Sequence, residues 1–411
     1  MKNARPNVLY ISYDGMTDPL GQSQVLPYLK GLSSDYNIHL ISFEKPDNYT
    51  AHNETIAEIC RESNITWHAL TYTKRPPVLS TVYDIMKLFK LAKKLDSQFD
   101  FKIIHCRSYI SAFVGLSFKR KRQKKFIFDM RGFWADERVD GGIWNLKNPV
   151  FKLIYTYFKK KEKQYFSESD AIISLTENGK QEILSWNLPH VTAEKITVIP
   201  CCVNTTLFQQ KADEIQTSTL KKSLGISEDD FILGYVGSIG TWYMLPEMLD
   251  YFNVLLEVKP QAKFLFVSGD NPKNIIDLAV NKGISENKIL VQKCLHKDVP
   301  TYISLFHQSI FFIIPAYSKK ASSPTKQGEL MAMGVPVVCN SGVGDSDLVV
   351  KKYQSGIVVD VFDSLHYRKA VKQALNTEFD VKMINFGASD FYGLEKGIQN
   401  YYAVYRKLMN D

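Results

Sequence analysis

The sequence predicts an α/β protein built from two doubly wound parallel sheets. Short apolar runs alternate with helical patterns along almost the whole chain, as strands and crossover helices do in βαβ units. A polar stretch at residues 203–228 interrupts this alternation, which then restarts. The length of 411 residues suits two domains of about 200 residues each.

The first series of elements lies in the N-terminal half. Its apolar runs are short and rich in β-branched and aromatic residues, and the stretches between them repeat apolar residues every three or four positions. Strands are expected at 8–12, 38–43, 101–105, 126–129, 171–174 and 197–199, and helices at 23–32, 81–95 and 149–166. The pattern predicts a parallel sheet covered by helices on both faces.

The second series repeats this pattern after the polar interruption. Strands are expected at 232–237, 264–267, 289–291, 310–314, 336–338 and 357–359, with a helix at 245–258 among those between them. We therefore expect one domain at 1–204 and a second at 205–385, with the linker near 204–226. The segment 386–411 is aromatic and helical, and we expect it to pack back on the first domain.

The net charge of +8 is concentrated in two basic runs. Residues 119–125 carry six basic side chains in seven positions, and residues 159–163 carry four in five. Such runs fit an anionic membrane surface or nucleic acid. No nucleic-acid-binding signature accompanies them, which disfavours nucleic acid. The remaining alternatives are peripheral membrane association and a solvated basic face without a partner.

Cysteine usage and hydropathy indicate the compartment. The six cysteines are scattered and form no Cys-x-x-Cys pair, which argues against a zinc knuckle or a secreted disulfide framework. No apolar run approaches the roughly 20 residues that cross a bilayer, and no signal-peptide core precedes the first strand. We expect a cytoplasmic protein with reduced thiols, or one bound peripherally to the inner face of the cytoplasmic membrane.

A polar, glycine-containing turn at residues 14–24 follows the first strand. Ligands of doubly wound sheets bind at the carboxyl ends of the strands. We expect a helix to open at Ser23, so that Gly21 allows close backbone approach and the amide of Gln22 lies at a positive helix end. This arrangement suits the diphosphate or sugar of a donor. A purely structural loop is the alternative.

The corresponding turn of the second domain, at residues 234–242, contains three glycines. Gly237 and Ser238 lie where its first strand ends, and we expect them to contact a ligand through the backbone. Alternatively, the glycines only allow close packing of strand and helix. Neither turn is Gly-x-Gly-x-x-Gly, which disfavours a nicotinamide dinucleotide.

Residues 322–339 combine a polar loop, a short helix and a buried strand. Proline near the first helical position marks the start of the helix, and Gly334 marks its end. Ser323 and Thr325 lie at the helix start, where free N–H groups attract phosphate. Lys326 suits a phosphate, and Glu329, one turn later on the same side, suits the two hydroxyls of a ribose. The alternative is an ordinary surface helix with an ion pair between these two residues.

A charged and aromatic cluster follows the strand at 126–129. The cluster consists of Asp129, Arg131, Trp134, Asp136 and Glu137. Aromatic rings stack on sugar faces and carboxylates accept hydrogen bonds from sugar hydroxyls, so the carboxylates and Trp134 are candidates for an acceptor site. A group of carboxylates that cap a helix is the alternative.

Four segments in the right order resemble family-4 glycosyltransferases. Residues 322–329 resemble their nucleotide-sugar signature in the variant Ser-Pro-Thr-Lys-x-x-Glu, and residues 198–208 resemble their Val-Ile-Pro-Asn-Gly-Val-Asp crossover. Residues 267–270 resemble their Gly-Asp-Gly turn, and residues 291–300 resemble the strand and loop that hold the nucleotide base. The resemblance spans about residues 6–360.

The resemblance implies a GT-B fold, with two Rossmann-like domains facing each other across a cleft. The first domain would receive the acceptor and the second would hold a nucleotide-sugar donor, with retention of configuration. No cofactor and no metal are expected. The residues implied in catalysis are Lys326 and Glu329, with Arg131 assisting.

Two departures from the family pattern affect the site. The first of two glutamates seven residues apart falls at Ala321, and no Arg–Lys pair follows the first strand of the second domain, where residues 238–243 carry no cation. Because charge that develops in the transition state needs stabilisation, Lys326 is the expected replacement.

The expected function is transfer of a hexose from a nucleotide-sugar to a hydroxyl of a growing glycan, lipid-linked in bacterial O-antigen, capsule or exopolysaccharide assembly. The leaving diphosphate would itself accept the proton of the acceptor, so that positioning and electrostatics determine the rate. A GT-B nucleotide-sugar epimerase is one alternative. A non-catalytic nucleotide-sugar-binding subunit of an assembly complex is the other.

Overall fold

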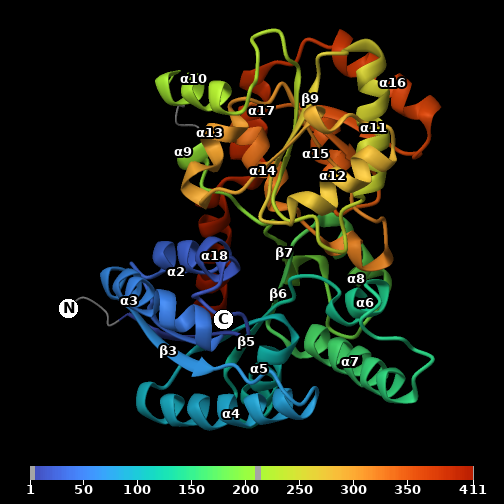
Figure 1. Ribbon diagram of the computed structural model, residues 1–411. Helices are drawn as coiled ribbons and strands as arrows, with labels where there is room; N and C mark the ends of the chain where they lie inside the picture. The colour runs from blue at the N-terminus through green and yellow to red at the C-terminus, as the bar shows by residue number, and fades with distance from the viewer. Residues whose placement is uncertain (1–4, 209–213, 411) are drawn as a thin grey trace. The chain divides into compact units, whose positions relative to one another are not determined.

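The computed structural model describes residues 5–208 and 214–410. The chain forms two compact units (Figure 1). Unit 1 comprises Met1–Cys201 and Leu394–Asp411, and unit 2 comprises Cys202–Gly393. The divisions therefore fall at Cys201 and Leu394, compared with the expected positions 204 and 386.

Unit 1 contains a seven-stranded, all-parallel sheet in the order β3-β2-β1-β4-β5-β6-β7. Its strands are β1 (Asn7–Ser12), β2 (Asn37–Glu44), β3 (Ile65–Thr71), β4 (Ile103–Arg107), β5 (Lys125–Asp129), β6 (Ala171–Ser174) and β7 (Ile196–Val198). Its first six strands follow the Rossmann order, in which the direction of winding reverses between β1 and β4.

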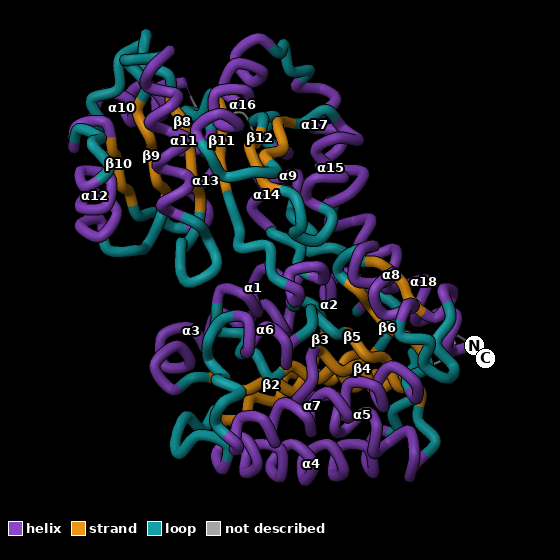
Figure 2. The backbone as a smooth tube through the Cα atoms, turned by 90° about the vertical axis from the view of Figure 1, so that its right-hand side faces the viewer, coloured by secondary structure: helices purple, strands orange, loops and turns teal. Residues whose placement is uncertain are grey.

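Helices cover both faces of this sheet. They are α1 (Pro19–Gln24), α2 (Leu26–Leu32), α3 (Pro46–Glu62), α4 (Leu79–Phe99), α5 (Ser108–Arg122), α6 (Trp134–Asp140), α7 (Pro149–Glu168), α8 (Glu177–Ser185) and α18 (Leu394–Asn410). Figures 1 and 2 show α4, α5 and α7 together on one face and α2 and α18 on the other. Helices α2 and α18 pack so closely that a Cβ on Gly31 would lie 2.6 Å from Ile398.

Unit 2 contains a six-stranded parallel sheet in the order β10-β9-β8-β11-β12-β13 (Figure 2). Its strands are β8 (Ile232–Val236), β9 (Lys263–Val267), β10 (Ile289–Gln292), β11 (Gln308–Phe311), β12 (Val337–Asn340) and β13 (Gly356–Val359). This is again the Rossmann order, and the winding reverses between β8 and β11. Apolar residues of all six strands form one continuous core with the surrounding helices.

The helices of unit 2 are mostly short. They are α9 (Thr205–Phe208), α10 (Glu214–Ser223), α11 (Leu245–Val258), α12 (Pro272–Asn281), α13 (Val299–Ile303), α14 (Thr325–Ala332), α15 (Ser346–Tyr353), α16 (Ser364–Asn376) and α17 (Val381–Gly387). The expected linker at 204–226 contains α9 and α10, and residues 209–213 of it lie outside the described residues. Within the part of the chain that the structure describes, no helix is long and apolar enough to span a membrane.

Two details of unit 1 differ from the sequence prediction. Strand β3 was not expected, because it lies at the edge of the sheet and only its first residue, Ile65, is buried. The helix expected to open at Ser23 begins at Pro19 instead, because proline favours the first helical position.

Candidate functional site

The carboxyl ends of β8 and β11 meet at the point where the winding of unit 2 reverses. The loop after β8 is joined to the segment after β11 by backbone hydrogen bonds, from Met244 N to Phe312 O at 2.9 Å and from Ile314 N to Trp242 O at 3.0 Å. A bridge between Tyr243 and Ile313 adds to this connection. The two segments therefore form one fixed edge at the position where doubly wound sheets bind ligands.

Lys326 lies against this edge. It belongs to the first turn of α14, which begins after Pro324 as expected, and its side chain is buried. Its Nζ lies 3.5 Å from the ring centre of Tyr243 and 3.9 Å from that of Tyr235, and it has no hydrogen-bond partner among the described residues. Burial lowers the pKa of the Lys326 ammonium well below its usual range, although Glu329 and Asp270 act in the opposite direction.

An unpaired buried ammonium on aromatic faces is costly to maintain. Cation–π contacts contribute on the order of 0.5–2 kcal/mol each, which compensates only partly for the desolvation of a charged group. The expected alternative, an ion pair with Glu329, is not present among the described residues. The ammonium of Lys326 is therefore available to an anion.

Gly237 and Ser238 follow the end of β8, as expected from the sequence. Gly237 lies beside Lys326. Gly237 has a φ of +95°, and a Cβ there would lie 3.6 Å from Lys326 Nζ. The hydroxyl of Ser238 donates to Asp270 Oδ1 at 3.0 Å, and Ile239 N donates to Asp270 Oδ2 at 2.6 Å. Ser238 thus helps Asp270 to fix the loop. The amide of Gly237 donates to Val267 O at 2.9 Å, and the absence of a side chain at this position leaves room for Lys326.

Glu329 follows Lys326 by one helical turn. Its Oε1 lies 3.4 Å from Nε2 of His296, whose side chain is largely exposed. The hydrogen bond to Glu329 raises the pKa of His296. Thr325 occupies the first helical position and Ser323 the preceding loop, and both are half-buried. The expected donor residues of unit 2 are therefore gathered around the start of α14.

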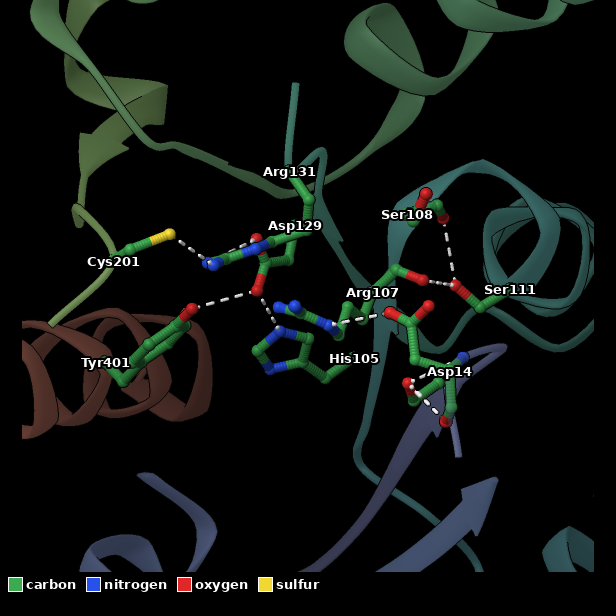
Figure 3. Close-up of polar contacts among 10 residues, drawn as sticks. Asp14, His105, Arg107, Ser108, Ser111, Asp129, Arg131, Cys201 and Tyr401 are labelled. Atoms are coloured by element: carbon green, nitrogen blue, oxygen red, sulfur yellow. Dashed lines mark hydrogen bonds and ion pairs between the residues drawn. The ribbon is translucent and has the colours of Figure 1, made fainter. Parts of the chain in front are cut away.

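The charged cluster of unit 1 has a different character (Figure 3). Asp129 is fully buried and accepts a hydrogen bond from Tyr401 OH at 2.8 Å, while His105 Nε2 lies 3.5 Å from the same oxygen. Arg131 approaches its other oxygen at 3.8 Å and donates to Cys201 Sγ at 3.2 Å. Burial alone would raise the pKa of Asp129, but Arg131 and His105 lower it to about 2.

These contacts revise the expected acceptor residues. Asp136 is also buried, and accepts from Tyr155 OH at 2.8 Å and from Lys159 Nζ at 2.7 Å. Trp134 packs on Tyr109 and Phe158. Asp129, Asp136 and Trp134 are thus engaged inside unit 1, and Glu137 is half-buried in α6. This engagement argues against the sugar contacts expected of the two aspartates.

Gly21 and Gln22 lie within α1 rather than before a helix. A Cβ on Gly21 would lie 2.2 Å from Gly15 O, and Gln22 N donates to Asp18 O at 3.2 Å. Gly21 is therefore required for packing against the preceding loop, and the Gln22 amide is already used. The role expected for these residues at a free helix end is wrong.

Three further residues around α14 received no individual role from the sequence, although Asp270 and His296 lie in two segments that carry the family resemblance, 267–270 and 291–300. His296 contacts Glu329, Asp270 fixes the loop after β8, and Lys319 places its Nζ 3.6 Å from the ring centre of Trp242. Lys319 and Lys320 immediately precede the recognised motif. Their proximity to it was the available signal.

Comparison with known proteins identifies the family. Residues 28–207 match the model described as Glycosyltransferase Family 4, and residues 216–389 match the model described as Glycosyl transferases group 1. The chain belongs to the family-4 type of glycosyltransferase. The family expected from the sequence is confirmed, whereas its Ser-Pro-Thr-Lys-x-x-Glu variant stays a prediction.

One curated relative is the capsular polysaccharide biosynthesis glycosyltransferase CapM of Staphylococcus aureus. It is 23% identical over 228 residues, which cover 56% of this chain and 57% of CapM. The chain is thus aligned with little more than half of that relative.

Solved structures show the same fold at low sequence identity. A glycosyltransferase from Rickettsia africae has a TM-score of 0.73 at 14% identity, covering 99% of both chains. HepE of Anabaena, solved with UDP and glucose, has a TM-score of 0.70 at 13% identity, covering 97% of this chain and 99% of its own. The expected fold class, GT-B with two Rossmann-like domains, is confirmed.

Proposed function

We propose that this glycosyltransferase moves a hexose from a nucleoside-diphosphate sugar to a hydroxyl of a growing bacterial surface glycan, with retention of configuration. The observation that carries the proposal is the buried ammonium of Lys326, which has no hydrogen-bond partner among the described residues and lies beside Gly237. An anion at this position would restore the charge balance that burial has removed. A diphosphate leaving group is such an anion, and its charge increases as the glycosidic bond breaks.

Glu329 supplies the second element of the proposed donor site. A carboxylate that accepts from both ribose hydroxyls fixes the nucleoside, while the lysine one turn away binds the diphosphate. In the structure, Glu329 contacts the exposed His296. Donor binding would exchange this contact for the ribose.

The glycan acceptor is proposed from the relatives. CapM is named for capsular polysaccharide biosynthesis, which supports a surface polysaccharide, and a lipid-linked chain is the form of acceptor that we propose. The leaving diphosphate would accept the proton of the acceptor hydroxyl on the same face of the sugar. In this mechanism no protein base is required, and Lys326 stabilises the departing charge.

The test is donor binding followed by product analysis on the purified chain. A panel of nucleotide-sugars would be screened by thermal shift, since a ligand at 100 times its Kd adds about 2.7 kcal/mol of stability. The donor that binds would then be incubated with lipid-linked acceptors, and the anomeric configuration of the product read by NMR. An isomerised donor formed without acceptor would identify an epimerase instead, and binding without turnover would identify a non-catalytic subunit.

For peripheral membrane association, we propose a surface other than the two basic runs. Five of the ten basic side chains in the runs at 119–125 and 159–163 are paired with carboxylates. Lys119 pairs with Asp170, Arg120 with Glu168, Arg122 with Asp96, Lys124 with Asp96 and Asp100, and Lys159 with Asp136 and Glu162. Paired charges offer less attraction to lipid headgroups.

The first half of α4 is a better candidate for the membrane-facing surface. Val78, Leu79, Val82, Tyr83 and Met86 are 47–67% exposed and lie on one side of the helix. Exposed Lys74, Arg75, Lys90, Lys93 and Lys94 flank them, whereas Asp84 is buried and pairs with Lys87. An apolar strip flanked by exposed basic residues matches the boundary of an anionic bilayer.

Vesicle co-sedimentation tests this surface. The unmodified chain is expected to pellet with vesicles containing phosphatidylglycerol and not with pure phosphatidylcholine. Val82→Asp combined with Met86→Asp should abolish pelleting, and Lys121→Glu, in the basic run of α5, should leave it unchanged. Loss with Lys121→Glu alone would return the assignment to the basic runs, and pelleting of no variant would favour a soluble acceptor.

A further inference from the structure

A second lysine, Lys319, contacts the loop after β8 in addition to Lys326. Lys319 lies in the 3₁₀ turn Tyr317–Ala321 and is 5% exposed. Its Nζ is 3.6 Å from the ring centre of Trp242, and Lys326 Nζ is 3.5 Å from that of the adjacent Tyr243. Two consecutive aromatic residues of one loop therefore each hold a lysine from another part of unit 2.

The backbone fixes Lys319 in this position. Its carbonyl oxygen accepts from Ser322 N at 3.1 Å and from Gly344 N at 2.8 Å. On the opposite side, the hydrogen bond from Ile314 N fixes the carbonyl of Trp242. The ring and the lysine are thus anchored independently of each other, so the contact is built into the fold.

Lys319 and Lys326 contact the segment that departs from the family pattern, residues 238–243. Residues 238–243 carry no cation of their own, but they carry the rings that receive cations from the 3₁₀ turn and from α14. Both lysines lie at the carboxyl edge of β8 and β11, where the winding reverses. A diphosphate carries charge on two phosphate groups and needs more than one cation for neutralisation.

We propose that Lys319 is the second cation of a diphosphate site and that Lys319 and Lys326 together replace the missing Arg–Lys pair. This inference rests on the proposed function, since it takes a nucleoside-diphosphate sugar as the donor. Lys326 belongs to α14, which also carries the carboxylate proposed for the ribose. Lys319 contributes to the discrimination between a diphosphate and a monophosphate.

The neighbouring Lys320 provides a matched control. It lies in the same 3₁₀ turn, is exposed, and has its Nζ 5.2 Å from the ring centre of Tyr317. It carries the same charge one residue away, but the ring that its ammonium faces belongs to its own 3₁₀ turn and not to the loop after β8. Long-range electrostatic effects of losing one positive charge should therefore be similar for the two lysines.

Calorimetric titration of the full chain with UDP and UMP, and with GDP and GMP, tests the inference. The unmodified chain should bind one nucleoside diphosphate more tightly than its monophosphate. Lys319→Met should weaken diphosphate binding at least about 10-fold, which corresponds to about 1.4 kcal/mol, and leave monophosphate binding unchanged. Lys319→Arg should keep the preference, and Lys320→Met should change either affinity less than about 2-fold.

The outcomes separate the inference from the proposed function. If the unmodified chain binds no nucleoside diphosphate, the donor assignment itself fails. If it binds one and folded Lys319→Met binds it equally well, only the role of Lys319 fails. An equal loss of diphosphate and monophosphate affinity in Lys319→Met would also overturn the inference, because it would indicate a structural role for the lysine in the loop.

Discussion

The two sheets have the same Rossmann strand order, but the charged side chains at their carboxyl ends have different surroundings. In unit 1, Asp129 and Arg131 are buried beside each other, and His105 and Tyr401 complete their surroundings. In unit 2, Lys326 is buried on two rings without a hydrogen-bond partner among the described residues. The same architecture therefore uses charge for internal cohesion in one unit and leaves it available for a ligand in the other.

This difference is a guide to function. A buried charge that is balanced by neighbouring charges contributes to the specificity of the fold, and its removal lowers the free energy of unfolding. A buried charge that is not balanced lowers stability unless a ligand binds to it, and its removal affects ligand affinity or turnover. Substitutions in the two units should therefore affect different measurements.

The largest expected effect is on stability, at Asp129. Asp129→Asn leaves Arg131 as an uncompensated buried charge, which should lower the free energy of unfolding by about 3–5 kcal/mol, measured by urea denaturation. Glu62→Gln, at an exposed position in α3, should change it by less than about 0.5 kcal/mol. Equal stability of the two variants would contradict the description of unit 1 as a compensated cluster.

The pKa of Asp129 gives this prediction a pH dependence. Its folded-state value of about 2 lies below the unfolded value of about 3.9. The stabilisation is therefore complete above about pH 4 and is lost as the pH falls toward 2. Asp129→Asn should show a shallower loss of stability across this window.

In unit 2, the main expected effect is on turnover. Lys326→Ala should reduce kcat about 100-fold or more, as the loss of a group that stabilises developing charge does, while the free energy of unfolding stays the same or rises. If kcat is retained and only the donor KM rises, Lys326 contributes uniform binding and another group stabilises the leaving diphosphate.

A smaller effect is expected at Glu329. Loss of a charge-assisted hydrogen bond costs about 1.5–3 kcal/mol, so Glu329→Gln should weaken binding of the free nucleotide at least about 10-fold. Titration calorimetry measures this. His296→Asn removes only the contact between His296 and Glu329 and should not weaken binding. Unchanged nucleotide affinity in folded Glu329→Gln would contradict the ribose assignment.

The smallest expected effect is the pH dependence of nucleotide binding. An anionic diphosphate raises the lowered pKa of Lys326, so binding takes up a proton and affinity falls as pH rises above the free-state pKa, by at most about tenfold per pH unit. Glu329, Asp270, Tyr235 and Tyr243 face the same ammonium. Calorimetry in buffers of different ionisation enthalpy detects the uptake, and Lys326→Gln should abolish it.

Local sequence patterns were sufficient for most of the fold. Helix α11 begins and ends at the predicted residues, 245 and 258, because proline and a dense apolar stripe mark it. Strand β3 lacked such a signal, since only Ile65 is buried and its half-buried and exposed residues include the polar His68 and Thr66. Periodicity identifies buried elements better than edges.

The candidate residues of unit 2 and the charged cluster of unit 1 differ in how far the sequence could predict them. Lys326 and Glu329 share one helix, so their spacing alone placed them together. The partners of Asp129 and His105 are Tyr401 and Tyr405, which come from α18 about 300 positions along the chain. No local pattern reveals such contacts, and the carboxylates of unit 1 therefore resembled a ligand site.

The return of α18 to unit 1 has a consequence for the order of assembly on the ribosome. The main part of unit 1 emerges first, then all of unit 2, and only then the helix that carries Tyr401 and Tyr405. Until that helix emerges, Asp129 lacks the hydrogen bond from Tyr401 and α2 lacks the helix that packs against it. Unit 2 is contiguous and can complete its own core earlier. Synthesis thus begins with unit 1, but unit 1 is the last of the two units to acquire all of its helices.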